Sequence, residues 1–118
     1  MVKKTDYIYQ YKKRNNRNMI NKLKLNPDNP RSMSDSHFKR LKQKIKEFPE
    51  MLEKRPIVYD ENNIVLGGNQ RLRVLRALAK DGFEIKDEYF TDASGWTEEQ
   101  KRNFVINDNI SDGDWDED

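Results

Sequence analysis

Cysteine is absent from this sequence of 118 residues, and histidine occurs only once, at position 37. Without thiols the chain forms no disulfide, no thiolate metal site and no cysteine-dependent catalytic site, which fits a reducing cytoplasm. A lone histidine makes no metal centre, so we expect His37 to be an ordinary surface or half-buried residue. Apolar runs of roughly 18 residues are missing, and the basic N-terminus lacks the apolar segment of a signal peptide, so neither a membrane span nor a secretion signal is predicted.

Apolar residues are also scarce. They make up 34% of the chain, whereas charged residues make up 37%, against about a quarter in an average domain. The length corresponds to one domain. We therefore expect a small core and divide the chain into a basic, flexible arm (residues 1–18), one domain (residues 19–110) and an acidic tail (residues 111–118).

The two signs of charge are unevenly distributed. Residues 1–55 carry 16 Lys and Arg against 6 Asp and Glu, whereas residues 56–118 carry 7 against 15. A basic first half suits a polyanionic partner such as nucleic acid, and an acidic second half suits a metal ion or a basic surface. Two solvated segments of opposite bias would give the same numbers, so charge alone leaves both interpretations open.

Hydrophobic spacing predicts the elements of the first half. Alternation over residues 19–25 indicates a short strand, and the prolines and asparagines of residues 26–31 indicate a rigid loop. Phe38, Leu41, Ile45 and Phe48 form one stripe of a helix over residues 34–48, capped by Ser34 or Ser36 and ended by Pro49.

The second half opens with two β-branched runs, 56–59 and 64–66, which predict a hairpin. A helix over 69–80 follows and ends before Gly82, and a weaker extended segment leads from 83 toward 90. Thr97 and Gln100 form a capping box for a helix to about 107 that buries Phe104, Val105 or Ile106. We expect Trp96 and Trp115 to pack rather than to stack on bases. The predicted fold is α+β (α/β), with a small mixed sheet and about three helices.

The stretch Val65-Leu66-Gly67-Gly68-Asn69-Gln70-Arg71-Leu72-Arg73 joins a predicted strand to a helix N-terminus. Backbone N–H groups and the helix dipole make such a junction attractive to phosphate, and glycines let a ligand approach closely. Two arginines in the first turn oppose the helix dipole, which a bound anion would offset. A plain strand-to-helix turn with solvated arginines is the alternative.

Five segments in order resemble the ParB/sulfiredoxin superfamily. They are Pro27-Asp28-Asn29-Pro30-Arg31, an amphipathic helix, Arg55-Pro56-Ile57-Val58, the glycine junction, and Asp108-Asn109 with Gly113-Asp114-Trp115-Asp116. The resemblance spans about residues 21–115 and is strongest to the ParB-like (ParB-like nuclease) N-terminal domains of phages and mobile elements. It implies a ParB/sulfiredoxin-like fold.

The family's site residues transfer one by one. Gly68 and Arg71 match the ParB phosphate motif, whereas Asn69 and Gln70 replace its Glu and Arg. Sulfiredoxin chemistry is excluded because Asn69 stands at the catalytic cysteine. Arg55 replaces the usual Gln. Asp108-Asn109 resembles the Glu-Asn pair that closes the nucleotide site, with Asp108 as candidate catalytic residue and the pair as candidate Mg²⁺ ligands. Helix capping by Asn109 is the alternative. The implied phosphate or nucleotide site comprises Asn29, Arg31, Arg55, Gly67, Gly68, Asn69, Gln70, Arg71 and Arg73.

The resemblance implies a phosphate- or nucleotide-binding module that works with DNA in the cytoplasm of a bacterial host, with a nucleoside triphosphate and Mg²⁺ as candidate cofactors. A DNA methyltransferase or another phage protein is a candidate partner. Without the family's reading helix, DNA contact would be to phosphates, through Lys12, Lys13, Arg14, Arg17, Lys39 and Lys42. The alternatives are a metal-dependent nuclease or nucleotide-dependent phosphotransferase (NTPase), and a protein-binding accessory that uses its acidic tail.

Overall fold

A computed structural model describes residues 16–27 and 33–111, with the side chains of the last helix described up to Asp108. The fold is α+β, as predicted. In the described residues the elements run α2 (Arg17–Lys22), α3 (Asp35–Glu47), α4 (Met51–Lys54), β1 (Ile57–Tyr59), β2 (Val65–Gly67), α5 (Asn69–Lys80), a 3-10 turn η1 (Asp87–Tyr89), β3 (Phe90–Asp92) and α6 (Glu98–Ser111). No described helix is both long and apolar enough to cross a bilayer.

The sheet is small and mixed. Its order is β2-β1-β3, with β1 antiparallel to β2 and parallel to β3. The predicted hairpin is confirmed. Its turn is closed by Asp60, whose Oδ1 accepts the N–H groups of Asn62 and Ile64 at 2.8 and 3.0 Å. Asn63 takes the left-handed conformation, with φ +62°, which asparagine tolerates in turns.

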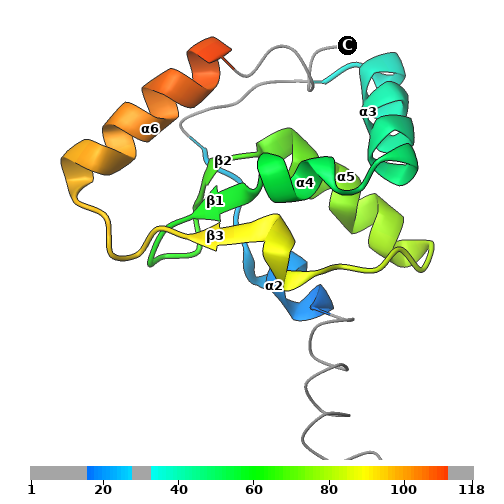
Figure 1. Cartoon of the computed structure of the whole chain (residues 1–118), viewed down its shortest axis with the longest axis horizontal. Coiled ribbons are helices and arrows are strands. Elements are labelled where there is room, and N and C mark those ends of the chain that lie inside the picture. The colour runs from blue at the N-terminus through cyan, green and yellow to red at the C-terminus, as the bar shows by residue number, and fades with distance from the viewer. Residues whose placement is uncertain (1–15, 28–32, 112–118) are drawn as a thin grey trace, which may run out of the picture.

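Helices cover both faces of the sheet (Figure 1). Side chains alternate along the strands: Ile57 and Val65 join the cluster that contains the helical residues of α2 to α5, whereas Val58 and Leu66 join the cluster packed by α6. We call these two sides the core face and the α6 face. The strand side chains therefore alternate between the two faces with a period of two. Among the described helices, α6 is the one that packs on the second face, next to β2.

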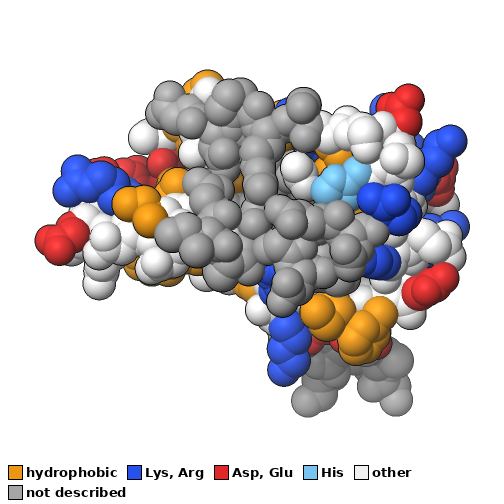
Figure 2. Space-filling view, turned by 90° about the horizontal axis from the view of Figure 1, so that it is seen from above, with side chains coloured by type: hydrophobic (Ala, Val, Ile, Leu, Met, Phe, Trp, Pro, Cys, Tyr) orange, Lys and Arg blue, Asp and Glu red, His pale blue; other side chains and the backbone are white. Residues whose placement is uncertain are grey.

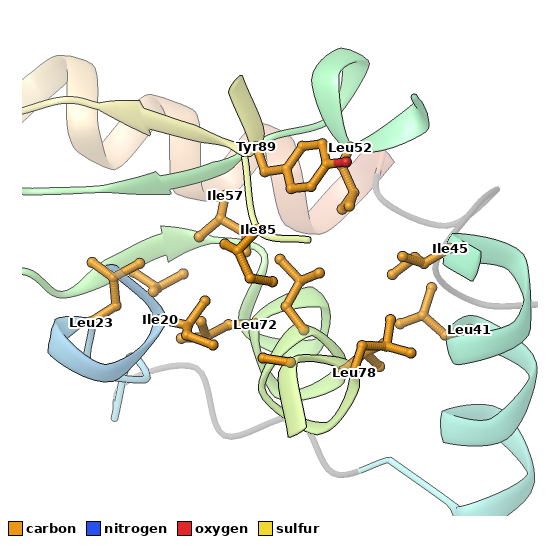
Figure 3. Packing of buried hydrophobic residues seen from close by; sticks show 14 residues of the cluster. Ile20, Leu23, Leu41, Ile45, Leu52, Ile57, Leu72, Leu78, Ile85 and Tyr89 are labelled. Carbon is orange, nitrogen blue, oxygen red and sulfur yellow. The ribbon is translucent and has the colours of Figure 1, made fainter. Parts of the chain in front are cut away.

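The core face holds most of the buried surface. Leu41 and Ile45 of α3 and Leu72, Leu75 and Leu78 of α5 are at most 1% exposed. Figure 3 shows side chains of this cluster converging from several elements, among them Ile20 of α2, Leu41 of α3, Leu72 of α5 and Ile57 of β1. Tyr89 lies beside Leu52 at one edge.

The stripe predicted for α3 is confirmed for Leu41 and Ile45, with Phe38 partly buried against the same cluster. It is wrong for Phe48, which follows the last residue of the helix and is 54% exposed. Ser34 caps α3 by accepting the His37 N–H at 3.1 Å.

The strand predicted over residues 19–25 is wrong. Residues 17–22 form α2, and only Lys24 pairs in a strand-like way, with Ile64 beside β2. Ile20 and Leu23 are spaced by three and both point into the core, which suits a helical turn as well as a strand. A tertiary contact favours the helix: Arg76 of α5 donates from Nε to the Ile20 carbonyl at 2.9 Å and from Nη2 to the Leu23 carbonyl at 2.6 Å.

The last helix is longer than predicted. Its capping box is confirmed, because the Gln100 N–H donates to Thr97 Oγ1 at 3.1 Å and Gln100 Oε1 accepts the Thr97 N–H at 2.9 Å. The helix, however, continues to Ser111. Phe104 and Val105 pack against the α6 face, whereas Ile106 is 56% exposed.

Candidate functional site

The junction between β2 and α5 is built around Gly68. This residue is the N-cap of α5 and has φ +101°, a conformation that only glycine adopts without strain. The Leu72 N–H returns to the Gly68 carbonyl at 2.8 Å and starts the helix. As in any α-helix, the N–H groups of the preceding turn have no acceptor within the helix, and the dipole adds positive potential there. Gly68 therefore sets the turn from β2 into α5.

Gly67 serves a different purpose, which is to let α6 approach. A Cβ atom on Gly67 would lie 2.8 Å from Phe104 Cε2 and 2.9 Å from Asp108 Oδ2. Real Cβ atoms essentially never show such distances, so a side chain here would force the Phe104 ring and the Asp108 carboxylate to shift. The tertiary structure thereby brings the Asp108 carboxylate, 41 positions along the chain from Gly67, to the glycine pair.

Arg71 is buried at this junction, with 2% of its surface exposed. Its Nη2 donates to the Pro56 carbonyl at 3.3 Å, and the same atom would lie 3.0 Å from a Cβ on Gly68. The guanidinium is therefore held between the start of β1 and the glycine pair. Burying a cation is costly without compensating groups, so a solvated arginine, one of the two sequence-based alternatives, is wrong for Arg71.

Asn69 connects the junction to a neighbouring loop. Its Oδ1 accepts the backbone N–H of Asn26 at 3.1 Å, and both residues make further interactions. Asn26 was not expected at the site, and nothing in the local pattern of residues 26–31 points to this bond. Asn29 and Arg31, which follow in that loop, lie outside the described residues.

Three further predicted phosphate-site residues are half-buried, without a described contact to the glycine pair. Arg55 ends α4 just before β1 and is half-buried, as are Gln70 and Arg73 in the first turns of α5. The side chain of Asn109 lies outside the described residues. Over residues 16–27 and 33–108, no three His, Asp or Glu side chains cluster as a metal-binding group. Asp108 is thus the carboxylate that the described structure places against the glycine pair.

The predicted DNA-contacting residues divide into three groups. Lys39 on α3 and Arg17 on α2 are exposed. Lys42 is half-buried and forms an ion pair with Asp81 at 3.4 Å. Lys12, Lys13 and Arg14 lie outside the described residues. Figure 2, seen from above, shows basic side chains beside the histidine at the α3 end of the molecule.

Shifted pKa values occur away from the glycine pair, around the hairpin, η1 and the start of α6. The hydrogen bond to Lys101 lowers the pKa of Glu61, and the same bond raises the pKa of Lys101. Burial, followed by the negative charge of Asp92, raises the pKa of Tyr59. Backbone hydrogen bonding from Ser94 lowers the pKa of Asp92. Burial and nearby carboxylates, Glu53 first, raise the pKa of Tyr89 to about 12, so this phenol is neutral at physiological pH.

Lys101 is the buried charge that sequence reasoning missed. Its Nζ lies 2.6 Å from Glu61 Oε1 and 3.4 Å from Glu98 Oε1, and the residue is 7% exposed. The ion pair joins the first turn of α6 to the hairpin turn. No spacing in the sequence relates positions 61 and 101, so only the fold reveals the contact.

Comparison of the chain with models of known protein families, with curated proteins and with solved structures gave no match.

Proposed function

We propose that this chain is a ParB-like module of a phage or mobile element that binds the phosphates of a nucleotide or nucleic acid at the β2–α5 junction. The observation that carries the proposal is the buried Arg71 guanidinium against Gly68, at the N-terminus of α5. A fixed cation, a helix dipole and a glycine backbone at one point form a recurrent arrangement for phosphate.

The Asp108 carboxylate against Gly67 sets the form of the ligand. A bare anion placed beside this carboxylate would be repelled, whereas a divalent cation coordinated by both would turn the repulsion into attraction. Mg²⁺ in proteins is commonly held by one or two carboxylates together with substrate phosphates. The proposed ligand is therefore a magnesium-bound polyphosphate, such as a nucleoside triphosphate.

Thermal denaturation tests this proposal. Nucleoside triphosphates with Mg²⁺ should raise the Tm, and inorganic phosphate should raise it less. Arg71→Lys keeps the charge but loses the donor fork, and should remove most of the rise. Lys80→Ala, which removes an exposed cation at the far end of the same helix, is the control and should retain most of it. A ligand panel that shifts the Tm of no variant at low salt would falsify the proposal.

The role of Asp108 has its own experiment. Asp108→Asn removes the charge at nearly constant volume, so the Tm rise should lose its dependence on Mg²⁺, and metal-free phosphate should stabilise the variant more than the wild type. Unchanged Mg²⁺ dependence in Asp108→Asn would rule out this carboxylate as a ligand.

The basic surface of α3 is the proposed contact with nucleic acid. Lys39, Arg40 and Lys46 are exposed along this helix, and such cations bind phosphates without reading sequence. Lys39→Glu should weaken binding to a short duplex and reduce the slope of log affinity against log salt by about 1 or more. Lys86→Glu is the control, because Lys86 lies beside Glu84 at 3.9 Å. Equal losses in both variants would contradict a specific role for α3.

A second candidate is metal-dependent phosphoryl transfer or nuclease activity, supported by the position of Asp108 at the junction. Purified protein with Mg²⁺ and either nucleoside triphosphate or plasmid DNA distinguishes the two candidates. Turnover that is lost in Asp108→Ala would favour the enzyme, whereas binding without turnover in the wild type would favour the binding module.

A further inference from the structure

A hollow of about 350 Å³ opens beside the first turns of α6. It is lined by Trp96, Gln100, Asn103 and Phe104. Positions 100, 103 and 104 are spaced by three and four, so they share one side of the helix, and Trp96 stands four residues before Gln100. The two rings meet edge to face, with centroids 5.4 Å apart and planes at 67°. The hollow is largely open to solvent, so a ligand would lie on its floor rather than be enclosed.

The walls of the hollow are held in place. The Trp96 N–H donates to the Ala93 carbonyl at 3.0 Å, and the Gln100 side chain is fixed by the capping box with Thr97. Lys101, the next residue, pins the same turn of α6 to Glu61. Phe104 packs against the cluster of Val58, Leu66 and Ala93. The aromatic pair is therefore preorganised, which lowers the cost of binding a rigid ligand.

The lining chemistry selects the class of ligand. The face of an aromatic ring favours a flat, π-faced group, and Trp96 supplies such a face. The Nε2 group of Gln100, whose Oε1 accepts the Thr97 N–H, offers donors for the edge of that group, and the Asn103 carboxamide offers donors and an acceptor. A methylated ammonium ion is the usual alternative for aromatic sites, but the four lining residues include no carboxylate. Nucleobases combine a stacking face with a hydrogen-bonding edge, and carboxamides pair with such edges.

We propose that the hollow lined by Trp96 and Phe104 binds an unpaired nucleobase, by stacking on the Trp96 ring and hydrogen bonding to Gln100 and Asn103. Phe104 links this site to the junction, because its Cε2 also lies against Gly67. The inference deepens the proposed function: a single strand whose phosphate binds at the junction would place a base near α6. A duplex, whose bases are stacked and paired, would not enter the hollow.

Fluorescence of Trp96 in a full-length Trp115→Phe protein tests the proposal, because Trp96 is then the only tryptophan. Single-stranded oligothymidylate and oligoadenylate should quench it and bind roughly 10-fold more tightly than an abasic strand with the same number of phosphates. Equal affinity for base-bearing and abasic strands overturns the proposal.

Binding variants are measured with labelled strands in the wild-type background. Trp96→Leu should reduce affinity for base-bearing strands to that of the abasic strand, and Trp96→Phe, which keeps a ring, should retain most of the difference. Circular dichroism should first show that both variants are folded. Asn103→Ala should alter the ratio between the adenine and thymine strands without affecting the abasic strand. A Trp96→Leu protein that still prefers base-bearing strands contradicts the stacking role.

Free nucleosides separate this inference from the proposed function, since they carry no phosphate. Quenching of Trp96 by millimolar adenosine or thymidine without any binding of strands would retain the base site and overturn the phosphate site. Strand binding that is lost in Arg71→Lys but is independent of bases would retain the phosphate site and overturn the base site. If neither nucleosides nor strands quench the fluorescence of Trp96, the base site is overturned outright.

Discussion

The two faces of the sheet are built very differently. On the core face, fourteen buried residues of the described chain form one cluster, nearly all aliphatic. They come from α2, α3, α4, β1, β2, α5 and η1 and from the segments between them. On the α6 face only Val58, Leu66 and Ala93 are buried in the cluster, with Trp96, Phe104 and Val105 packed partly against them. Hydrophobic stabilisation scales with buried apolar area, so the core face supplies most of the stability.

The α6 face buries fewer residues, and its helix carries the groups that we propose to contact ligands. Its helix is attached by the Glu61–Lys101 ion pair and by Phe104 and Val105 rather than by a wide apolar stripe. Both proposed ligand sites involve this helix: Asp108 at the junction, and the hollow beside Trp96. The stable face positions the glycine pair, and the face with less packing carries the groups proposed to meet the ligand.

The largest effect should come from truncating the core face. Leu72 is fully buried in α5, and Leu72→Ala should lower the free energy of unfolding by about 2–5 kcal/mol because it leaves a cavity. Leu66→Ala on the α6 face, where the residue is 8% exposed, should cost about 2 kcal/mol or less. Urea denaturation measures both. Equal losses would contradict the proposed division of stability between the faces.

The glycines give the next largest effect. Gly68→Ala should cost about 1–3 kcal/mol, because its φ of +101° is strained for alanine and the Cβ would also crowd Arg71 and Ile57. Gly82→Ala is the matched control: its φ is +91°, but a Cβ there meets nothing within 4 Å. It should cost about 1 kcal/mol. Thermal unfolding of the two variants separates strain from crowding, and an equal loss would leave no role for close approach at Gly68.

The two helix caps distinguish the faces at a smaller scale. Ser34→Ala and Thr97→Ala each remove an N-cap hydrogen bond of 3.1 Å, worth about 1 kcal/mol. On the core face the loss should appear in global unfolding. On the α6 face it should appear as faster amide exchange within α6, because this helix can open locally. Hydrogen exchange by mass spectrometry resolves the two patterns, and uniform acceleration along the chain in Thr97→Ala would argue against local opening.

The ion pair of Lys101 should give the smallest effect, since Glu61 is partly exposed and solvent screens the pair. The pKa of Glu61 is lowered from 4.5, so its contribution is present above pH 4.5 and is lost as the pH falls through the lower folded value. The pKa of Lys101 is raised from 10.5, so its contribution is present below pH 10.5 and is lost as the pH rises through the higher folded value.

The Tm difference between wild type and Glu61→Gln should therefore be constant between these limits and shrink at both extremes. Glu98→Gln, whose carboxylate is 3.4 Å from Lys101 and 79% exposed, is the control and should change the Tm less. A difference that grows on acidification would contradict the assignment.

Short-range signals predicted much of the fold. The buried positions of α3, the Ser34 cap, the Thr97–Gln100 capping box and the Asp60 turn of the hairpin each depend on residues within one or two turns of one another. The strand prediction for residues 19–25 failed because their apolar spacing suits both a strand and a helix. The deciding contact comes from Arg76, more than fifty positions away.

The candidate site shows the same limit. The glycine pair was visible as a strand-to-helix junction, whereas the positive φ of Gly68 was not predicted. Nothing local indicated that Arg71 would be buried against Pro56, that Asn69 would bind Asn26, or that Phe104 would reach Gly67. Each of these contacts joins separate segments of the chain.

The sequence by itself determined the α+β class, the helix caps, the hairpin and the glycine junction, because periodicity and turn chemistry act over a few residues. The tertiary structure decided which side of the sheet α6 covers, which arginine is buried and which carboxylate meets the glycines. These outcomes depend on how the two sheet faces pack, and packing joins residues that no local pattern relates.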